Sequence, residues 1–201
     1  MLGLYHLVTC QATVYDGKME TKSMLGKWDK WYKNLKGRTS FRYGNTVTYQ
    51  RGADFLSDME EVEDWGCGAG NFKKLYKGKY TGLDGSHNPY VDKVVDLCDY
   101  QSSVDGIMMR HVLEHNDNWR LVLRNAVASF NKKFCLVLFT PFVEHTHQIT
   151  HNEKHGVDVP DISFFHGDIE DYFHGLKWRL EKNIPTKTGY NLEHVYYVEK
   201  P

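Results

Sequence analysis

Three glycines at alternate positions are the first feature of the sequence that could do chemistry. Gly66, Gly68 and Gly70 follow a short run that begins at Glu61 and contains Asp64. Glycine tolerates backbone dihedrals that other residues avoid, so this stretch predicts a strand that turns sharply into a helix. The turn would leave bare amides at a helix N-terminus, where a ligand can approach the main chain closely. We therefore interpret the glycine turn as a ligand-binding element.

The spacing of the glycines separates two classes of ligand. A dinucleotide-binding turn places its third glycine at the sixth position, as G-x-G-x-x-G. Asn71 occupies that position here, and the observed spacing is G-x-G-x-G. Asn71 therefore counts against a nicotinamide-dependent oxidoreductase, which we keep as an alternative interpretation.

An acidic residue stands twenty residues after Asp64. Asp84, followed by Gly85, lies at the end of the second predicted strand, in YTGLDGS. A carboxylate at this place can accept hydrogen bonds from both ribose hydroxyls of a nucleoside, and we assign Asp84 and Gly85 to the site. The alternative for Asp84 is a helix N-cap or a turn residue.

A second pair of acids follows the third predicted strand. Asp96 and Asp99 lie in VVDLCDY, and either could accept a hydrogen bond from an adenine amine while Leu97 packs on the ring. We favour Asp96 for this role and interpret Asp99 as a turn residue.

The fourth predicted strand ends at Arg110 and His111. Ligands of open α/β folds bind at the carboxyl edge of the sheet, and imidazole titrates near neutral pH, so His111 is the first candidate base or substrate contact. Arg110 could pair with an anionic substrate or with a cofactor carboxylate. Side-chain alternation predicts that only one of the two faces the cleft. For His115 we favour a helix-start residue that is hydrogen-bonded to the backbone.

A histidine-rich segment follows the fifth predicted strand. His145, His147, His151 and His155 lie in what we predict to be a long loop. Three interpretations are open: a metal site, a plain solvated loop, and a substrate-recognition loop or lid, which we favour. We assign no metal, because no cysteine accompanies the histidines. His145 lies nearest the strand end and is the second catalytic candidate.

The elements that must position these residues alternate as in a βαβ fold. The predicted strands are 61–66, 79–84, 93–97, 104–110, 133–140, 177–184 and 193–200, and the predicted helices are 70–77, 87–92, 117–131 and 167–175. The last two strands should pair antiparallel, because the turn between them has no room for a crossover helix.

Two helices are predicted before residue 61. The segment KWDKWYKNLKGR has an apolar face composed of Trp28, Trp31, Tyr32 and Leu35. A second helix covers TVTYQRGADFLSDM, with Val47, Phe55 and Leu56 inward.

Bulk composition indicates an ordinary globular domain. The chain has 201 residues, of which 41% are hydrophobic and 25% charged, with a formal net charge of -1. This length suits one domain, and no run approaches the ~18 apolar residues of a membrane span. The four cysteines are widely spaced and suggest neither a zinc cage nor a disulfide framework, so we expect a reducing, cytoplasmic setting.

The charge is uneven near the N-terminus. Residues 18–51 contain nine Lys or Arg against two acids. The segment is either a solvated helical face or an arm that meets an anionic substrate such as RNA.

These motifs resemble those of the class I S-adenosylmethionine-dependent methyltransferases, many of which contain VLDxGCGxG and FDxVxxxxVLEH. The residues that match are Asp64, Gly66, Cys67, Gly68 and Gly70 for the first motif, and Asp105, Val112, Leu113, Glu114 and His115 for the second. The resemblance covers roughly residues 61 to 141. Glu63 departs from it, because an apolar residue is usual there, and we expect an exposed start of that strand.

The resemblance implies an α/β fold with a Rossmann-like, seven-stranded, mostly parallel sheet. The strand order would be 3-2-1-4-5-7-6 with strand 7 antiparallel, in a single domain of residues 1–201 with an N-terminal helical cap (1–60) and a cofactor-binding core (61–201). It implies S-adenosylmethionine as the cofactor. The three glycines and Cys67 would approach its amino-acid portion, with Asp64 beneath the ammonium.

In the same way the resemblance implies that Asp84 holds the ribose and that Asp96 and Leu97 contact the adenine. The methyl acceptor would be a hydroxyl or an amine of a small molecule, a glycan or an RNA, and a base such as His111 would be needed only where the acceptor must lose a proton. A partner subunit that keeps the fold without turnover is a third alternative.

Overall fold

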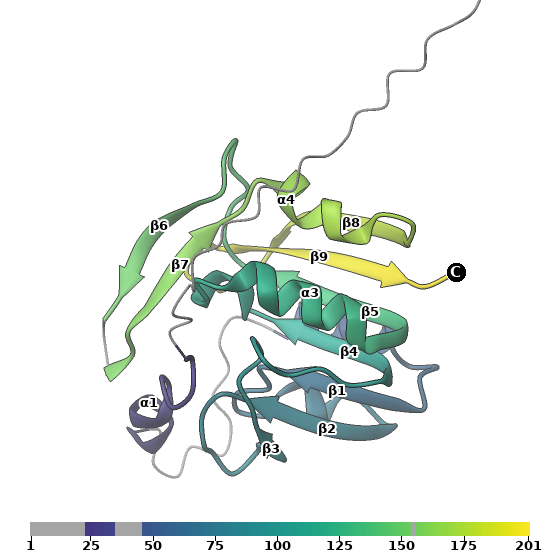
Figure 1. Ribbon diagram of the computed structural model, residues 1–201, viewed down its shortest axis with the longest axis horizontal. Coiled ribbons are helices and arrows are strands. Elements are labelled where there is room, and N and C mark those ends of the chain that lie inside the picture. Colours follow the sequence, from purple (N-terminus) through teal and green to yellow (C-terminus); the bar gives the residue numbers. More distant parts are fainter. Residues whose placement is uncertain (1–22, 35–45, 154–155) are drawn as a thin grey trace, which may run out of the picture.

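The computed structural model describes residues 23–34, 46–153 and 156–201. Its centre is a seven-stranded sheet with the order β3-β2-β1-β4-β5-β9-β8 (Figure 1). The strands are β1 (Glu61–Trp65), β2 (Lys79–Asp84), β3 (Lys93–Val94), β4 (Val104–Arg110), β5 (Phe130–Leu138), β8 (Lys177–Pro185) and β9 (Leu192–Glu199). Strands β1 to β5 run parallel to one another, and β9 runs antiparallel to both β5 and β8. The predicted fold class and strand order are confirmed.

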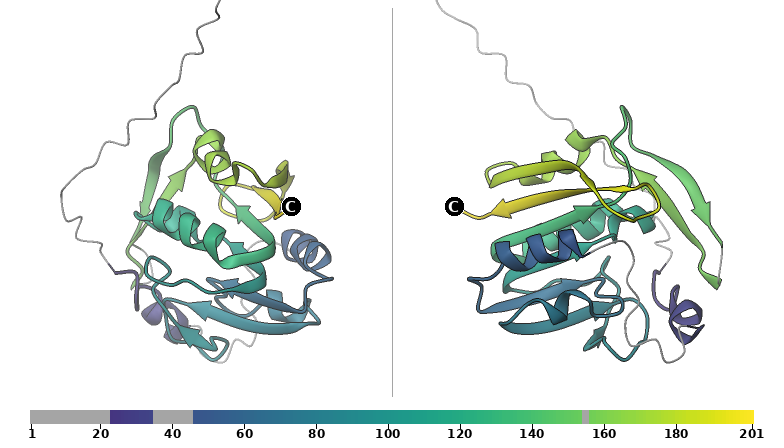
Figure 2. Two further views of the ribbon diagram at one scale, coloured as in Figure 1. Left: turned by 45° about the vertical axis from the view of Figure 1, so that its right-hand side comes forward. Right: turned by 180° about the vertical axis from the view of Figure 1, so that it is seen from behind.

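Helices cover both faces of the sheet, which explains why its central strands are apolar nearly throughout. Helices α3 (Trp119–Ser129) and α4 (His166–Glu170) lie on one face, and α2 (Val47–Phe55) lies on the other (Figure 2). Alternate residues of β4 enter the two cores: Ile107 packs in the cluster that contains α3 residues, and Met108 in the cluster that contains α2 residues.

The helices were predicted less accurately than the strands. Helix α3 confirms the prediction over 117–131, and 167–175 holds the short α4 and the 3-10 turn η4 (Asp171–Phe173). The prediction over 70–77 is wrong because the short connection to β2 holds only the 3-10 turn η1 (Phe72–Lys74), and the prediction over 87–92 is wrong because those residues form turns.

The predicted inward face of α2 is partly wrong. Leu56, which follows the helix, is fully buried, and Phe55 packs against the core. Val47, by contrast, is 37% exposed, because it lies at the first helical position while the buried face begins at Thr48. No helix among the described residues is long and apolar enough to cross a membrane.

The histidine-rich segment forms a β-hairpin, so its prediction as a long loop is wrong. Strands β6 (His147–Asn152) and β7 (Val159–Ser163) pair antiparallel in a separate two-stranded sheet that projects beyond the main sheet (Figures 1 and 2). None of the residues of β6 is buried. An alternation of apolar and polar residues, which is the sequence signal of a strand, is therefore missing from it.

Glu63 lies inside the sheet core, not at an exposed strand start. Its side chain is 5% exposed and accepts hydrogen bonds from the Trp65 indole (2.9 Å), the Tyr100 hydroxyl (2.8 Å) and the Ser102 hydroxyl (2.7 Å). A buried carboxylate is tolerated only where donors replace its water, and three donors do so here.

Replacing Glu63 by Ala should lower the free energy of unfolding by at least about 3 kcal/mol, because the buried Trp65 indole and the half-buried Tyr100 and Ser102 hydroxyls lose their acceptor. Urea denaturation followed by circular dichroism measures this loss. Glu61→Ala is the matched control on the same strand, where the half-exposed ion pair with Lys79 should be worth less than about 1 kcal/mol. Equal losses in the two variants would contradict the prediction.

Candidate ligand site at the carboxyl edge of the sheet

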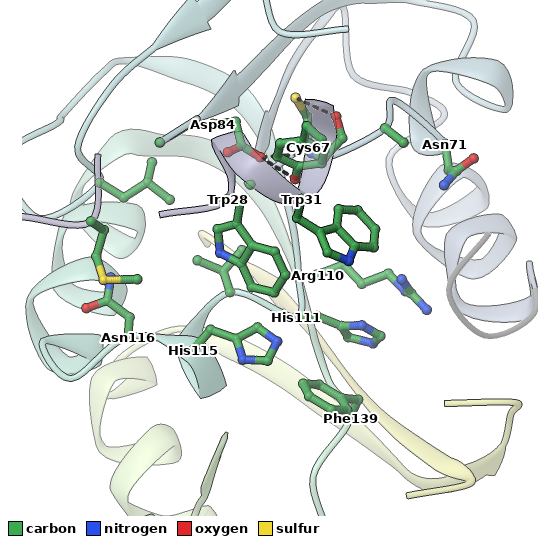
Figure 3. A pocket seen from close by; sticks show the side chains of 18 of the residues that line it. Trp28, Trp31, Cys67, Asn71, Asp84, Arg110, His111, His115, Asn116 and Phe139 are labelled. Atoms are coloured by element: carbon green, nitrogen blue, oxygen red, sulfur yellow. Dashed lines mark hydrogen bonds between the residues drawn. The ribbon is translucent and has the colours of Figure 1, made fainter. Parts of the chain in front are cut away.

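A cavity of about 630 Å³ lies at the carboxyl edge of the parallel strands, beside the glycine turn (Figure 3). Its size is that of a small-molecule site. The predicted site residues that line it are Gly66, Cys67, Gly68, Asp84, Gly85, Leu97, Arg110 and His111. The predicted site residues Asp64, Gly70, Asp96 and His145 are not part of its lining.

The glycine turn has the backbone that the sequence predicts. Gly66, Gly68 and Gly70 all have positive φ angles, of 76°, 52° and 64°. The amides of Gly66 and Cys67 donate to the Leu83 carbonyl at 2.8 and 2.9 Å, which ties the turn to β2. The α-helix expected to follow the turn is absent from the described residues there, so the site has no helix N-terminus at this point.

Asp84 joins the end of β2 to the glycine turn. Its Oδ2 accepts the Gly68 amide (3.0 Å) and its Oδ1 accepts the Ser86 amide (2.9 Å). The Tyr32 hydroxyl donates to Oδ2 at 3.4 Å. Burial raises the pKa of Asp84 to about 6, although the amides of Gly68 and Ser86 oppose the shift.

Asp64 lies inside the sheet. Its side chain is 3% exposed, and its Oδ2 accepts the Tyr80 hydroxyl at 2.9 Å. Burial raises the pKa of Asp64 to about 7, with the neighbouring charge of Asp84 adding to the shift.

Asp96 anchors an N-terminal strap, by which we mean residues 23–34 including helix α1 (Asp29–Asn34). Its Oδ2 accepts the Ser23 hydroxyl (2.9 Å) and the Met24 amide (3.2 Å), and its Oδ1 accepts the Cys98 amide. The strap also bonds the loop after β2, because the amide of residue 26 donates to the carbonyl of residue 85 at 2.8 Å and that of Trp28 to Ser86 Oγ at 2.9 Å.

The strap carries aromatic side chains into the cavity. Trp28, Trp31 and Tyr32 all line it, which agrees with the predicted apolar face (Figure 3). No residue of α1 is buried, so the strap is held by these polar contacts and by the packing of Trp28 on the His115 ring, at a centroid distance of 5.3 Å. Leu35, the fourth member of the predicted face, lies outside the described residues.

Arg110 and His111 both line the cavity, so the prediction that only one of them faces it is wrong. Strand β4 ends at Arg110, and His111 has a left-handed φ of 57°, which breaks the alternation of the strand. Their side chains meet at Glu193 of β9, whose Oε1 lies 2.7 Å from Arg110 Nη2 and 2.5 Å from His111 Nε2.

The sequence analysis did not identify Glu193 as a site residue. Its side chain is fully buried, and its Oε2 accepts the Thr48 hydroxyl of α2 at 3.1 Å. Arg110 also donates from Nε to Thr48 Oγ1 (3.2 Å) and from Nη1 to the Tyr49 hydroxyl (3.0 Å). An acid in an alternating strand such as LEHVYYVE gives no local sign that it faces a site.

The surroundings of His111 favour its neutral form. Burial and the adjacent Arg110 charge lower the pKa of His111 well below its ordinary value. Burial raises the pKa of Glu193, and Arg110 opposes that shift. A neutral imidazole that donates Nε2–H to Glu193 presents Nδ1 as an acceptor.

His115 also reaches the cavity. Its Nδ1 donates to the Pro160 carbonyl at 3.0 Å, so the predicted backbone hydrogen bond is present, and it lies 3.1 Å from Asp161 Oδ1. The prediction that His115 begins a helix is wrong, because it is the last residue of a 3-10 turn (Leu113–His115) and α3 begins at Trp119. Burial lowers its pKa, but hydrogen bonding to Asp161 and the charge of Glu114 outweigh burial, so the net pKa is raised.

The hairpin borders the same cavity through Asn152 and Asp161. His145 is exposed, and its carbonyl accepts from His147 Nδ1 at 2.7 Å. His151 pairs with Asp158 at 2.6 Å, and His155 lies outside the described residues. Within 23–34, 46–153 and 156–201, no three His, Cys, Asp or Glu side chains are grouped as metal ligands would be.

Comparisons with known proteins give similarity in structure alone. No family model matches the sequence, and no curated protein matches it. Among solved structures, 1,6-didemethyltoxoflavin-N1-methyltransferase from Burkholderia thailandensis, with S-adenosylhomocysteine bound, has a TM-score of 0.60 at 13% identity over 76% of each chain. Magnesium protoporphyrin IX methyltransferase from Synechocystis, with S-adenosylmethionine bound, has a TM-score of 0.55 at 14% identity over 87% of this chain and 91% of that one.

A third match comes from the complex of the Haloferax volcanii Trm112 methyltransferase activator with a methyltransferase, at a TM-score of 0.57 and 15% identity over 87% of this chain and 96% of that one. The chain has the class I methyltransferase fold. At these identities the similarity establishes the fold and no more.

Gly66→Ala should lower the free energy of unfolding by about 3 kcal/mol or more. The added Cβ would lie 2.3 Å from Val112 Cγ2, in addition to the strain of a positive φ. Gly175→Ala isolates the strain, because Gly175 has a φ of 78° and its added Cβ would meet nothing within 4 Å. Its loss should be about 1–2 kcal/mol. Thermal and urea unfolding of both variants decide the matter, and a loss for Gly66→Ala no greater than that for Gly175→Ala would contradict it.

The ligand-free protein should show a pH-dependent stability term from Asp84. Its pKa is raised from 3.8 to about 6, so the folded state binds its proton more tightly than the unfolded chain does. The stabilisation is therefore complete below about pH 4 and is lost as the pH rises through about 6, by on the order of 2–3 kcal/mol. Urea titrations should therefore show that the free energy of unfolding of the wild type falls relative to that of Asp84→Asn as the pH rises from about 4 through about 6. Asp99→Asn, at an exposed acid, should leave the profile unchanged.

Proposed function

We propose that this protein is an S-adenosylmethionine-dependent methyltransferase. The observation that carries the proposal is the pairing of the Gly68 turn with the Asp84 carboxylate, on neighbouring parallel strands at the edge of a cavity of small-molecule size. The structural neighbours that contain S-adenosylmethionine or S-adenosylhomocysteine support it.

The lining fits the parts of this cofactor. The turn of Gly66, Cys67 and Gly68 offers close backbone approach to the amino-acid portion, with Gly70 shaping the turn and Asp64 supplying negative charge from beneath. Asp84 and Gly85 stand where a ribose would bind. Leu97 offers an apolar surface for adenine.

Asp96 has a modified part in the proposal. Both its carboxylate oxygens are hydrogen-bonded, and Oδ2 holds the strap through Ser23 and Met24. We therefore propose that Asp96 acts on the adenine end of the site by fixing the strap over it.

The bound cofactor would supply a methyl group already activated on a sulfonium. What is left for the protein is to place the acceptor in line and to exclude water, which positioning alone can accelerate strongly. Trp28 and Trp31 on the strap and Asn152 on the hairpin enclose the cavity for this purpose. His111 is the proposed base, and the exposed His145 lies outside the cavity lining.

We propose a small molecule or a small glycan as the acceptor in preference to RNA. Trp28 and Trp31 line the cavity and pack on each other, and Lys27 donates to the Asp158 carbonyl at 3.1 Å. Some of the other basic residues of 18–51 lie outside the described residues.

We also propose a single domain in which the segment before β1 caps the core. A reducing, cytoplasmic setting is proposed as well, in keeping with the buried free thiols of Cys67, Cys98 and Cys135.

Calorimetry with S-adenosylhomocysteine should give one binding site. Asp84→Ala should weaken binding at least about tenfold, which corresponds to roughly 1.5 kcal/mol, the value of a hydrogen bond to a charged group. Asp99→Ala should bind as the wild type does, because Asp99 is exposed and outside the cavity lining. Absence of binding in the folded wild type would refute the proposal.

The same protein separates the proposal from its alternatives. A nicotinamide enzyme would change the fluorescence of NADH, whereas we expect retention on S-adenosylhomocysteine resin with no such change. A partner subunit without turnover would bind the cofactor but transfer no methyl group to any compound of a wide acceptor panel.

A further inference from the structure

The acceptor half of the cavity is bordered by a continuous series of rings, which we call the aromatic wall: Trp31, Trp28, His115, Phe139 and His111 (Figure 3). Neighbouring ring centroids in this series lie 5.9, 5.3, 5.3 and 4.6 Å apart. Such distances are those of packed aromatic pairs. The wall is built from the strap, from the segment that follows β4 and from the residue that follows β5, so it is assembled only in the folded protein.

The charged groups beside the wall are already paired with one another. Arg110 is bonded to Glu193, Thr48 and Tyr49. Asp161 accepts the Tyr190 hydroxyl at 3.1 Å and lies 3.1 Å from the His115 imidazole. An acceptor rich in hydroxyls would have to break these pairs to satisfy its own polar groups, whereas a flat ring would not.

One polar group in the wall is set apart by its geometry. His111 is held from behind by Glu193, with Nε2 2.5 Å from Oε1, while Arg110 and Thr48 fix the carboxylate. The backbone of His111 is left-handed, a conformation that costs free energy in a residue with a side chain and that clusters at functional sites. This arrangement orients a single imidazole nitrogen, Nδ1, away from Glu193.

From these observations we propose that the acceptor is a hydroxyl group on a planar aromatic ring, that His111 removes its proton, and that Glu193 is the residue that positions His111. The proposal rests on the methyltransferase function proposed above. The ring would pack against the aromatic wall, with its hydroxyl directed to His111 Nδ1.

The transfer step balances without any further reactant. A lone pair of the acceptor oxygen forms the new bond to the methyl carbon while the carbon–sulfur bond breaks and its electron pair stays on sulfur. The hydroxyl proton passes to His111 Nδ1, and Glu193 offsets the imidazolium charge. The products are a methyl aryl ether, S-adenosylhomocysteine and a proton that leaves to solvent.

The strength of the base agrees with this class of acceptor. Because burial lowers its pKa, His111 is a weak base. A phenolic hydroxyl, with an ordinary pKa of about 10, is far more acidic than an aliphatic hydroxyl and suits a weak base better.

A matched pair of probes tests the acceptor class without relying on turnover. 2-Naphthol and 2-decalol share a carbon skeleton and a hydroxyl, but only the first is flat and acidic. Calorimetry on the protein saturated with S-adenosylhomocysteine should show 2-naphthol binding at least tenfold more tightly than 2-decalol, and no binding of methyl glucoside. Phe139→Leu should weaken 2-naphthol binding at least threefold. Phe142→Leu, a change at a ring that stacks on His194 outside the cavity lining, should not.

A second measurement tests the positioning role of Glu193. Mass spectrometry of 2-naphthol incubated with S-adenosylmethionine should detect the methyl ether, and Glu193→Gln should slow its formation at least tenfold with less than a threefold change in S-adenosylhomocysteine affinity. Nitrogen NMR of the imidazole should show His111 protonated at Nε2 in the wild type and a mixture of tautomers in Glu193→Gln. Glu181→Gln on the neighbouring strand β8 serves as the control.

The outcomes separate the two proposals. If S-adenosylhomocysteine does not bind, the proposed function fails and the acceptor class fails with it. If it binds but 2-decalol or methyl glucoside binds as tightly as 2-naphthol, the aromatic acceptor is wrong while the function stands. An unchanged tautomer and an unchanged transfer rate in Glu193→Gln would overturn the role of Glu193.

Discussion

The buried carboxylate of Glu193 constrains the half of the cavity that Arg110 and His111 line. A charge that is wholly removed from water must be matched by donors, or the fold loses several kcal/mol. Here Arg110, His111 and Thr48 supply them. These donors come from α2, from the end of β4 and from the residue after it, so one carboxylate on β9 fixes segments that are remote along the chain. The orientation of His111 toward the cavity is a consequence of that pairing.

The other half of the cavity depends on a comparable carboxylate. Asp84 bonds the glycine turn through Gly68 and the following loop through Ser86, and it also meets Tyr32 of the strap. The proposed ligand contact and the strap contact therefore involve the same side chain. Because α1 buries no residue of its own, the strap is held by a few polar contacts and by the packing of Trp28 on His115, and segments held in this way open more readily than a packed core.

Burial at this edge also keeps the pKa values of its acids close to neutrality. Those of Asp64 and Asp84 are raised to about 7 and about 6 because both side chains lie in a poorly solvated region. A cationic ligand would favour their charged forms and so gain affinity from the same burial that penalises charge in the ligand-free protein. The burial that raises the pKa values of Asp64 and Asp84 in the ligand-free protein would therefore also strengthen binding of the proposed sulfonium cofactor.

Local pattern was sufficient for much of the fold. The strands and the positive φ angles of Gly66, Gly68 and Gly70 agree with what the sequence indicates, because apolar runs and glycines act within a few residues of themselves. The order of the sheet agrees with what the resemblance to the class I methyltransferases implies. The predictions of short helices were wrong, because one helical turn gives too little periodicity to recognise. The hairpin was not predicted either, because β6 buries no residue and so has no apolar alternation.

The sequence by itself therefore determined the sheet, the glycine turn and the acid at Asp84. Only the tertiary structure decided that Glu193 meets His111 across 82 residues, that both Arg110 and His111 reach the cavity, and that Asp96 holds the strap. The physical reason is that a buried polar group must find its partners wherever the packed chain brings them, and no local pattern records which residues those are.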